Sequence, residues 1–266
     1  MINQYPGLPP EILCHITEYT ASITINRPER KNAINGKMWE ALADLFDRLK
    51  TDPEIRVIII RGEGGNFSAG ADISEFDDMR GDSDTARAYE LANSRAFAAI
   101  RDAGVPVIAV IRGICFGGGF GIAAACDLRI AASDAQFSVP AAKLGLAYPQ
   151  DAMIDIVRSC GTQTAKFLTF TGSRMDSGRA LEAGFLLAIH DATHLEEECK
   201  ILASRIAGNA PLSVRASKVA IDAASLDDES RKKMAIELGA MTFDSADYAE
   251  GRAAFREKRQ PLFSGT

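Results

Sequence analysis

The chain has 266 residues, of which 47% are apolar, and a net charge of −6, so it can bury the core of one large domain. The acidic balance excludes a basic surface for nucleic acid or anionic membranes, and no segment is apolar enough to span a bilayer. Five cysteines at irregular spacing predict reduced thiols and a cytoplasmic location. The three histidines have no metal-ligand spacing beyond one weak i, i+4 pair, so no metal site is predicted.

Strands and helices alternate in the first 150 residues, which predicts an α/β core. Asn35 can cap a helix at 37–50, where apolar side chains recur at helical spacing. The β-branched run at 56–61 is typical of a strand covered on both faces. The predicted strands are 12–17, 21–26, 56–61, 105–111, 128–132 and 136–139, and the two longer predicted helices are 37–50 and 85–102.

After Tyr148 the chain becomes mostly helical, with one short predicted strand at 186–189. There is no low-complexity linker and no internal repeat. We therefore predict a single continuous domain with a core at 1–200 and a C-terminal helical segment at 201–266, which packs on its own chain or on a neighbour. The predicted helices are 152–158, 162–170, 177–183, 195–207, 211–224 and 229–241.

Two glycine-containing loops, at 66–73 and 113–121, each follow a predicted buried strand. Each loop can expose a backbone N–H at a strand-to-helix turn, and two such donors aimed at one point hold an oxyanion. The second loop opens into an alanine-rich helix at 122–126, whose dipole adds positive potential there. The pair of loops predicts a site that stabilises an enolate or a similar oxygen anion.

The second loop also fits a dinucleotide fingerprint in form, as Gly119-x-Gly121-x-x-Ala124 after a strand. No acidic residue stands about 20 positions further on to hold a ribose, since Ala141 and Ala142 occupy that place. Close packing of a helix on a strand explains some of these glycines. We therefore expect no nicotinamide cofactor.

Several motifs occur in a characteristic order along the chain. They are Asn26-Arg27-Pro28, Asn32-Ala33-Ile34-Asn35, Phe67-Ser68-Ala69-Gly70-Ala71-Asp72-Ile73, Gly117-Gly118-Gly119 leading to Cys126-Asp127-Leu128-Arg129-Ile130-Ala131, and a tail from Glu250 to Phe263. Together they resemble the enoyl-CoA hydratase/isomerase (crotonase) superfamily over nearly the whole chain. The resemblance implies a crotonase-like α/β spiral of ββα units with a C-terminal helical trimerisation region. It also implies homotrimers, often paired into hexamers, and an acyl-CoA substrate, with coenzyme A as part of the substrate and no separate cofactor.

The resemblance also implies roles for individual residues. Ala71 and Gly118 would supply the two N–H donors to the thioester oxygen. Ala69 and Ile73 would line the adenine pocket with backbone groups, and Ala33 and Asp72 fall in the same coenzyme A-binding motifs. Arg27, Arg30 and Lys31 lie where the family contacts the phosphates of coenzyme A, although a solvated turn explains these three basic residues equally well.

The hydratases of this family use two glutamates, and this chain has neither. The positions that match them are Gly121 and Ala141, so a two-glutamate hydration mechanism is not expected. Tyr148 aligns with a tyrosine of the methylmalonyl-CoA decarboxylase branch and can donate a hydrogen bond or a proton, or its ring fills the acyl pocket. Asp151 is a base if it faces the pocket, or the N-cap of the helix at 152–158.

Other polar residues near these loops have simpler explanations. Glu75 and Asp78 lie in an acidic segment that covers the acyl chain in the family, or in a solvated loop. Cys115 is expected to be a small buried side chain, Asp127 a structural residue at a helix-to-strand turn, and Trp39 a core or interface residue. The predicted function is an acyl-CoA enzyme that works through an enolate, by isomerisation, decarboxylation or atypical hydration; the alternative is a non-catalytic acyl-CoA-binding protein.

Overall fold

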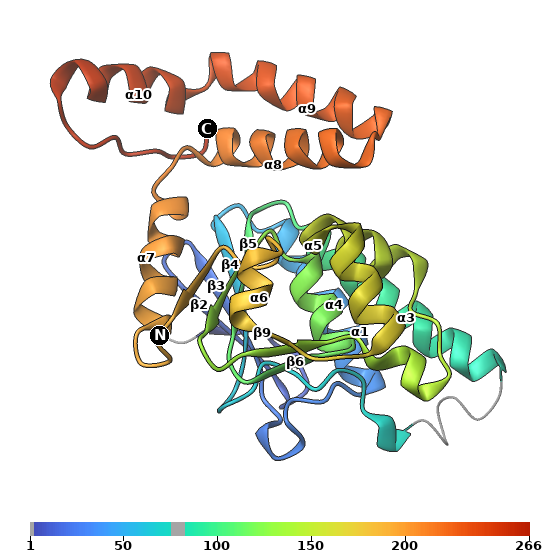
Figure 1. Ribbon diagram of the computed structural model, residues 1–266. Coiled ribbons are helices and arrows are strands. Elements are labelled where there is room, and N and C mark those ends of the chain that lie inside the picture. The colour runs from blue at the N-terminus through green and yellow to red at the C-terminus, as the bar shows by residue number, and fades with distance from the viewer. Residues whose placement is uncertain (1–2, 76–82) are drawn as a thin grey trace.

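The computed structural model describes residues 3–75 and 83–266. Within these residues, a central sheet has the strand order β1-β2-β3-β4-β5-β7-β10, and a small second sheet has the order β6-β8-β9 (Figure 1). β1 to β3 pair antiparallel, whereas β3, β4, β5, β7 and β10 pair in parallel. The strands are β1 (Asn3–Gln4), β2 (Ile12–Thr17), β3 (Thr20–Ile25), β4 (Val57–Gly62), β5 (Val107–Ile111), β6 (Ile114–Phe116), β7 (Leu128–Ala132), β8 (Gln136–Ser138), β9 (Met175–Asp176) and β10 (Ala188–His190).

Helices cover both faces of the central sheet and extend beyond it at the C-terminal end (Figure 1). They are α1 (Gly36–Lys50), α3 (Ser83–Arg101), α4 (Gly118–Ala125), α5 (Gln150–Thr171), α6 (Ser177–Glu182), α7 (Leu195–Ala207), α8 (Pro211–Leu226), α9 (Glu229–Met241) and α10 (Ala246–Glu257). Short 3₁₀ turns lie at Pro28–Arg30, Ile73–Glu75, Pro140–Leu144 and Thr242–Asp244. No helix of the described residues is long and apolar enough to cross a membrane.

The central parallel strands β4 and β5 are buried on both faces, as the β-branched run at 56–61 predicts. Alternate side chains of β4 face opposite sides: Ile58 and Ile60 join the large core with α1, α3, α4 and α5, whereas Val57 and Ile59 pack with α7. This alternation follows from the two-residue period of a strand. The sheet therefore separates a large core from a smaller one beneath α7.

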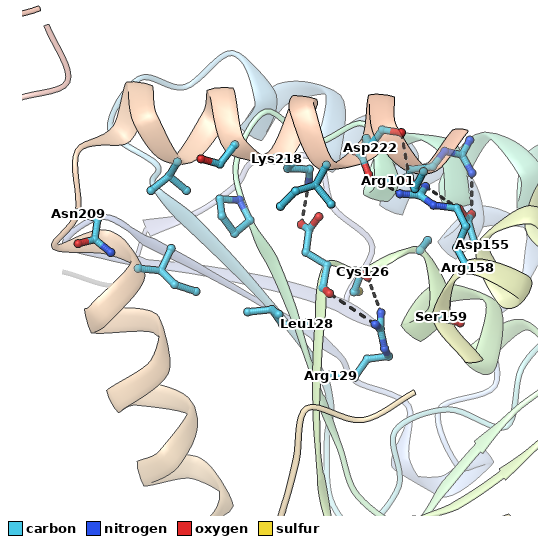
Figure 2. Close-up of a pocket in the computed structure, with 18 of the residues that line it drawn as sticks. Arg101, Cys126, Leu128, Arg129, Asp155, Arg158, Ser159, Asn209, Lys218 and Asp222 are labelled. Atoms are coloured by element: carbon cyan, nitrogen blue, oxygen red, sulfur yellow. Dashed lines mark hydrogen bonds and ion pairs between the residues drawn. The ribbon is translucent and has the colours of Figure 1, made fainter. Parts of the chain in front are cut away.

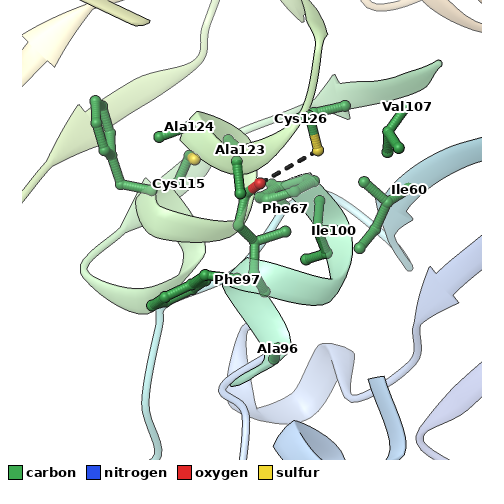
Figure 3. Close-up of a cluster of buried hydrophobic side chains, with 14 of the residues drawn as sticks. Ile60, Phe67, Ala96, Phe97, Ile100, Val107, Cys115, Ala123, Ala124 and Cys126 are labelled. Carbon is green, nitrogen blue, oxygen red and sulfur yellow. Dashed lines mark hydrogen bonds between the residues drawn. The ribbon is translucent and has the colours of Figure 1, made fainter. Parts of the chain in front are cut away.

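The helix α4 runs through the large core and is apolar on every side, which is the pattern of a fully buried helix. Its glycines and alanines let neighbouring elements approach closely. Figure 3 shows Phe67, Phe97 and Ile100 gathered around it, and each of these side chains is at most 1% exposed. The core thereby fixes the position of the first turn of α4 at Gly118.

Local sequence signals explain several helix boundaries. The Asn35 side chain accepts a hydrogen bond from the Met38 N–H at 2.9 Å, which confirms the predicted cap of α1. The two helices predicted at 152–158 and 162–170 are the halves of α5, which is kinked at Gly161, where φ is +74°. That backbone conformation favours glycine. The sequence did not predict β1, β6, β9 or α10.

The helices α8, α9 and α10 form a layer of their own beside the body of the molecule, and α7 leads into it (Figure 1). α8 and α9 pack as an antiparallel pair, and the C-terminal tail returns to the body, where Arg56 donates a hydrogen bond to the Phe263 carbonyl at 2.8 Å. The boundary predicted between residues 200 and 201 falls inside α7; that division stays a prediction.

Candidate functional site

The two glycine-containing loops lie directly against each other. Ser68 and Cys115 form a parallel β-bridge, in which the Phe116 N–H donates to the Ser68 carbonyl at 2.9 Å. Gly70 has a φ of +91°, and a Cβ at this position would lie 2.8 Å from the Gly118 nitrogen. Only glycine permits this approach of one backbone to another. The loops predicted from the sequence to share one site are therefore brought together.

Asn32 holds the first loop in place, a role that sequence reasoning missed. It is fully buried and left-handed at φ +57°. Its amide nitrogen donates to the carbonyls of Glu63 (2.9 Å) and Asn66 (2.7 Å), and its amide oxygen accepts from the Arg27 N–H (2.9 Å). The available signal was that Asn tolerates left-handed backbone and bonds to nearby main chain.

The backbone nitrogens of Ala71 and Gly118 lie near each other where the two loops meet. The Ala71 nitrogen lies 3.4 Å from where a Cβ of Gly118 would stand. Within the described part of the chain, neither N–H has a hydrogen-bond acceptor, although the neighbouring Asp72 N–H donates to Ile34 at 2.9 Å. Gly118 is also the first residue of α4, where N–H groups have no intrahelical partner and the helix dipole is positive. Two such donors can hold an oxygen anion.

Buried aromatic side chains pack against the backbone at Gly118 and hold it in place. A Cβ there would lie 2.9 Å from Trp39 Cζ2, so the indole ring requires glycine at this position. Trp39 donates through Nε1 to the Tyr89 hydroxyl at 3.2 Å, and its ring packs edge-on against Phe97 with the ring centroids 5.4 Å apart. Trp39 is fully buried, which confirms the prediction of a core residue. The aromatic contacts limit movement of the loop.

The space beside Gly121 is filled by Phe97 and by a further aromatic side chain, Tyr148. A Cβ at Gly121 would lie 2.5 Å from the Tyr148 hydroxyl oxygen and 2.7 Å from Phe97 Cζ. The Tyr148 hydroxyl donates to the Gly117 carbonyl at 2.9 Å, and burial raises the pKa of this phenol well above its usual value. Ala141 lies half-buried in the 3₁₀ turn Pro140–Leu144.

The three predicted carboxylates near the site have different surroundings. Asp151 is exposed in the first turn of α5; the helix begins at Gln150 with Pro149 as its N-cap, so the expectation that Asp151 is the cap is wrong. The Glu75 carboxylate accepts from the Gly36 N–H at 3.0 Å, at the positive end of α1. Asp78 lies outside the described residues.

The predicted coenzyme A residues lie on adjoining turns. The Arg27 guanidinium forms an ion pair with Asp72 at 2.6 Å and donates to the Ala33 carbonyl at 3.2 Å. Burial opposes ionisation of Asp72, but hydrogen bonds from Ser74 and Arg27 outweigh it and lower the pKa of the carboxyl group. Arg27 is therefore partnered within the protein.

The other members of this set differ in exposure and bonding. The Ala69 N–H donates to the Lys31 carbonyl at 2.9 Å, which joins the two turns. The side chain of Ile73 is 57% exposed. Arg30 and Lys31 are exposed and present the accessible positive charge of this region. Their predicted contact with coenzyme A phosphates stays a prediction.

Arg129, which sequence reasoning did not single out, supports the other end of α4. Its buried guanidinium donates to the carbonyls of Phe185 (2.5 Å), Cys126 (2.5 Å) and Ala123 (3.2 Å). The bonds to Ala123 and Cys126 satisfy carbonyl groups at the C-terminus of α4 and place positive charge at the negative end of its dipole. Desolvation lowers the pKa of Arg129. The role of Arg129 could have been inferred from its place, as a basic residue shortly after a predicted helix.

A cavity of about 1040 Å³ lies between α8 and the body of the protein (Figure 2). It adjoins the C-terminal end of α4, about 10 Å along the helix from Gly118 at 1.5 Å per residue, and neither Ala71 nor Gly118 lines it. Two ion pairs connect the body to α8 at this cavity, one between Arg158 and Asp222 and the other between Asp127 and Lys218. This cavity therefore lies at the interface between the body and the C-terminal helices, and it is separate from the site formed by the two glycine-containing loops.

Two sequence expectations about residues near α4 are confirmed. Asp127 accepts from the Val107 N–H at 2.7 Å and from Lys218 Nζ at 2.7 Å, which is a structural role at the helix-to-strand turn. Cys115 is fully buried, and burial raises the pKa of its thiol well above the usual value. Neither side chain is placed as a reactive group.

Comparison with known proteins agrees with this geometry. The enoyl-CoA hydratase/isomerase family model matches residues 15–266. A probable enoyl-CoA hydratase of Bacillus subtilis is 32% identical over 252 residues, which cover 94% of this chain and 97% of that protein. A mitochondrial Delta(3,5)-Delta(2,4)-dienoyl-CoA isomerase of Dictyostelium discoideum is 30% identical over 259 residues, covering 92% and 87%.

Solved structures agree as well. The crystal structure of an enoyl-CoA hydratase/carnithine racemase from Magnetospirillum magneticum matches with a TM-score of 0.91 and 36% identity over 97% of each chain. An enoyl-CoA hydratase/isomerase family protein from Hyphomonas neptunium matches with a TM-score of 0.91 and 34% identity, covering 96% of this chain and 98% of that one. These matches confirm the predicted crotonase-like α/β fold with its C-terminal helical region. The chain belongs to the enoyl-CoA hydratase/isomerase family.

Proposed function

We propose that this protein is an acyl-CoA-processing enzyme that stabilises a thioester enolate between the backbone N–H groups of Ala71 and Gly118. The observation that carries the proposal is this pair of adjacent donors, free of acceptors within the described residues and supported from below by Trp39. A preorganised donor of this kind is worth about 3–4 kcal/mol of transition-state stabilisation. The relatives are named as an enoyl-CoA hydratase and a dienoyl-CoA isomerase, which supports an acyl-CoA substrate.

The side chains around the two N–H donors favour a reaction that needs no carboxylate to act as acid or base. Positions 121 and 141 carry no carboxylate, and Phe97 and Tyr148 fill the space beside Gly121. Hydration needs groups that activate water and deliver a proton. Decarboxylation of a thioester with a carboxylate on its α-carbon breaks the C–C bond, releases carbon dioxide and leaves the electron pair as the enolate, without a base. We therefore favour decarboxylation; isomerisation requires a base, for which the exposed Asp151 is the candidate.

The test is a set of three substrates. Methylmalonyl-CoA and crotonyl-CoA are incubated with the protein and followed by mass, while a 3-enoyl-CoA is followed by the ultraviolet absorbance of the conjugated product, because isomerisation leaves the mass unchanged. Loss of carbon dioxide from methylmalonyl-CoA is the expected result. Hydration of crotonyl-CoA at a comparable rate would contradict the assignment. Tight binding of all three without conversion would favour the non-catalytic acyl-CoA-binding protein.

We also propose a homotrimer, alone or as a dimer of trimers, built through the C-terminal helices, and a cytoplasmic location. Large apolar side chains are exposed on this layer: Ile236 is 72% exposed, Phe255 is 87% exposed and Leu262 is 83% exposed. Large apolar side chains left exposed on one layer favour an interaction site there. Sedimentation equilibrium at several concentrations should give three or six times the chain mass of 28.6 kDa. A monomer throughout would contradict the proposal.

A further inference from the structure

One peptide unit links the Tyr148 hydroxyl to the proposed site. The carbonyl oxygen of Gly117 accepts hydrogen bonds from the Tyr148 hydroxyl at 2.9 Å and from the Gly121 N–H at 3.0 Å. The N–H of the same peptide unit is that of Gly118, one of the two proposed donors. The bond is trans, so its C=O and N–H point in opposite directions in one plane. Whatever fixes the Gly117 carbonyl therefore also fixes the direction of the Gly118 N–H.

This peptide unit needs an external support because glycine flanks it on both sides. Gly117 has φ +48° and ψ −117°, a conformation that side chains disfavour, and glycine readily samples others. The Gly117 N–H donates to the Ser138 carbonyl at 2.9 Å, which holds the preceding peptide. The hydroxyl of Tyr148 is the side-chain group that holds the next one.

The sequence is arranged so that this hydroxyl can reach its acceptor. Gly121 has no side chain, and a Cβ there would lie 2.5 Å from the Tyr148 oxygen. Phe97 bounds the same space, with Cζ 2.7 Å from that point. Gly121, one of the two positions that depart from the hydratase pattern, is thus the one that leaves room for Tyr148. Because a phenol has a single proton to donate, the proton of Tyr148 is engaged with the Gly117 carbonyl.

We propose that Tyr148 is a positioning residue, whose hydroxyl orients the Gly117–Gly118 peptide and strengthens the Gly118 N–H as a donor to the thioester oxygen. Hydrogen bonds in a chain polarise one another, so a bond to the carbonyl makes the N–H of the same amide a better donor. Burial keeps the phenol neutral by raising its pKa, so it remains a donor at ordinary pH. The inference rests on the proposed function, which supplies the anion that Gly118 would bind.

The contact itself can be tested without substrate, by nuclear magnetic resonance. With glycine labelled by ¹³C and ¹⁵N, only Gly-Gly pairs give carbonyl-to-amide correlations, and these are Gly64–Gly65, Gly117–Gly118 and Gly118–Gly119. In Tyr148→Phe, the ¹³C′ resonance of Gly117 and the ¹⁵N resonance of Gly118 should move upfield, because a hydrogen bond to a carbonyl deshields both nuclei. The Gly64–Gly65 pair should stay in place. Unmoved Gly117–Gly118 resonances would overturn the inference.

The consequence for binding can be tested with acetoacetyl-CoA, whose enolate absorbs in the near ultraviolet. The wild-type protein should raise the enolate fraction of the bound ligand. Tyr148→Phe should lower the enolate-to-keto ratio by about three- to tenfold, the value of one neutral hydrogen bond, with free coenzyme A bound equally well. Tyr19→Phe, which removes a hydroxyl from a half-exposed tyrosine at the β2–β3 turn, should leave the ratio unchanged.

The outcomes separate the two proposals. An enolate stabilised equally by wild type and Tyr148→Phe would overturn the positioning role and leave the proposed function standing. A wild-type protein that binds no acetoacetyl-CoA would overturn both. If Tyr148→Phe folds poorly, 3-fluorotyrosine at position 148 gives a stronger donor of nearly equal size, which should raise the enolate-to-keto ratio; an unchanged or lower ratio would contradict the inference.

Discussion

Gly121→Ala should destabilise the protein, although the same change usually stabilises a helix. Gly121 lies inside α4, where replacing glycine by alanine gains about 1 kcal/mol of helix propensity. The added methyl group would lie 2.5 Å from the Tyr148 hydroxyl and 2.7 Å from Phe97 Cζ. Phe97 is 1% exposed and packs against Trp39, so it has little room to move.

The magnitude follows from three contributions. Overpacking of a close-packed core costs about 1–3 kcal/mol. Displacing Tyr148 from the Gly117 carbonyl costs about 0.5–1.5 kcal/mol more. Against these stands the propensity gain of about 1 kcal/mol. The expected net loss in the free energy of unfolding is therefore about 0.5–3.5 kcal/mol.

Urea unfolding at one fixed protein concentration measures this loss, because association would otherwise shift the apparent stability. Gly239→Ala is the matched control: this glycine lies within α9, and a Cβ there would meet nothing within 4 Å. The control should be more stable by up to about 1 kcal/mol. A Gly121→Ala protein as stable as wild type would refute the packing argument. Adding Tyr148→Phe should recover part of the loss.

The same distances predict what happens when glutamates are introduced at positions 121 and 141 to create hydratase activity. Placing glutamates at positions 121 and 141 does not by itself recreate a two-carboxylate site, because the side chain at 121 would enter the space of Tyr148 and Phe97. We therefore expect Gly121→Glu with Ala141→Glu to be destabilised and to show no hydration of crotonyl-CoA. Efficient hydration by this double variant would show that Tyr148 and Phe97 can move aside to admit the glutamate side chain.

Three further predictions concern residues around the site. Gly118→Ala places a methyl group 2.9 Å from Trp39 Cζ2, so thioester turnover should fall by about 10- to 100-fold, whereas Gly65→Ala, with no atom within 4 Å, should leave it intact; equal losses would contradict the reasoning. Arg129→Met leaves three backbone carbonyls without their charged donor and should lower the free energy of unfolding by about 3 kcal/mol or more; a loss below about 1 kcal/mol would refute its supporting role. The pKa of Asp72 is lowered in the folded protein. The difference in free energy of unfolding between wild type and Asp72→Asn should therefore be full above the ordinary pKa of about 3.9 and should shrink as the pH falls below it. A difference that does not change with pH would count against the ion pair with Arg27.

Features encoded within a few residues could be predicted from the sequence. Asn35 three residues before Met38 marks the start of α1, and the bonded cap is present. The β-branched run that became β4 predicts burial on both faces, and its side chains divide between the two cores. Gly161 separates two predicted helices, and the structure kinks there. In each case the deciding interaction is local.

Features that depend on distant partners could not be predicted. The role of Asn32 depends on carbonyls at Glu63 and Asn66, more than 30 positions away. Strand β6 has only three residues, and it pairs with β8, from which α4 and β7 separate it in the chain. α10 contains a central glycine that weakens its helical signal.

The candidate site shows the same division. The two glycine loops were placed together from their pattern, because a strand-to-helix turn exposes N–H groups wherever it occurs. The contact of Tyr148 with Gly117 was not foreseen, since it joins residues 31 positions apart and depends on the space left by Gly121. The sequence places no carboxylate at positions 121 and 141, and the packing shows that Tyr148 and Phe97 occupy the space beside Gly121.

The central claim is that Ala71 and Gly118 hold the oxygen of an acyl thioester. Its most direct test is a calorimetric and ultraviolet titration of the wild-type protein with acetoacetyl-CoA, with free coenzyme A as the reference ligand. The account predicts that acetoacetyl-CoA binds more tightly than free coenzyme A and that its enolate absorbance rises on binding. Equal affinity for the two ligands, with no enolate formed, would contradict it and make the paired glycine loops purely structural.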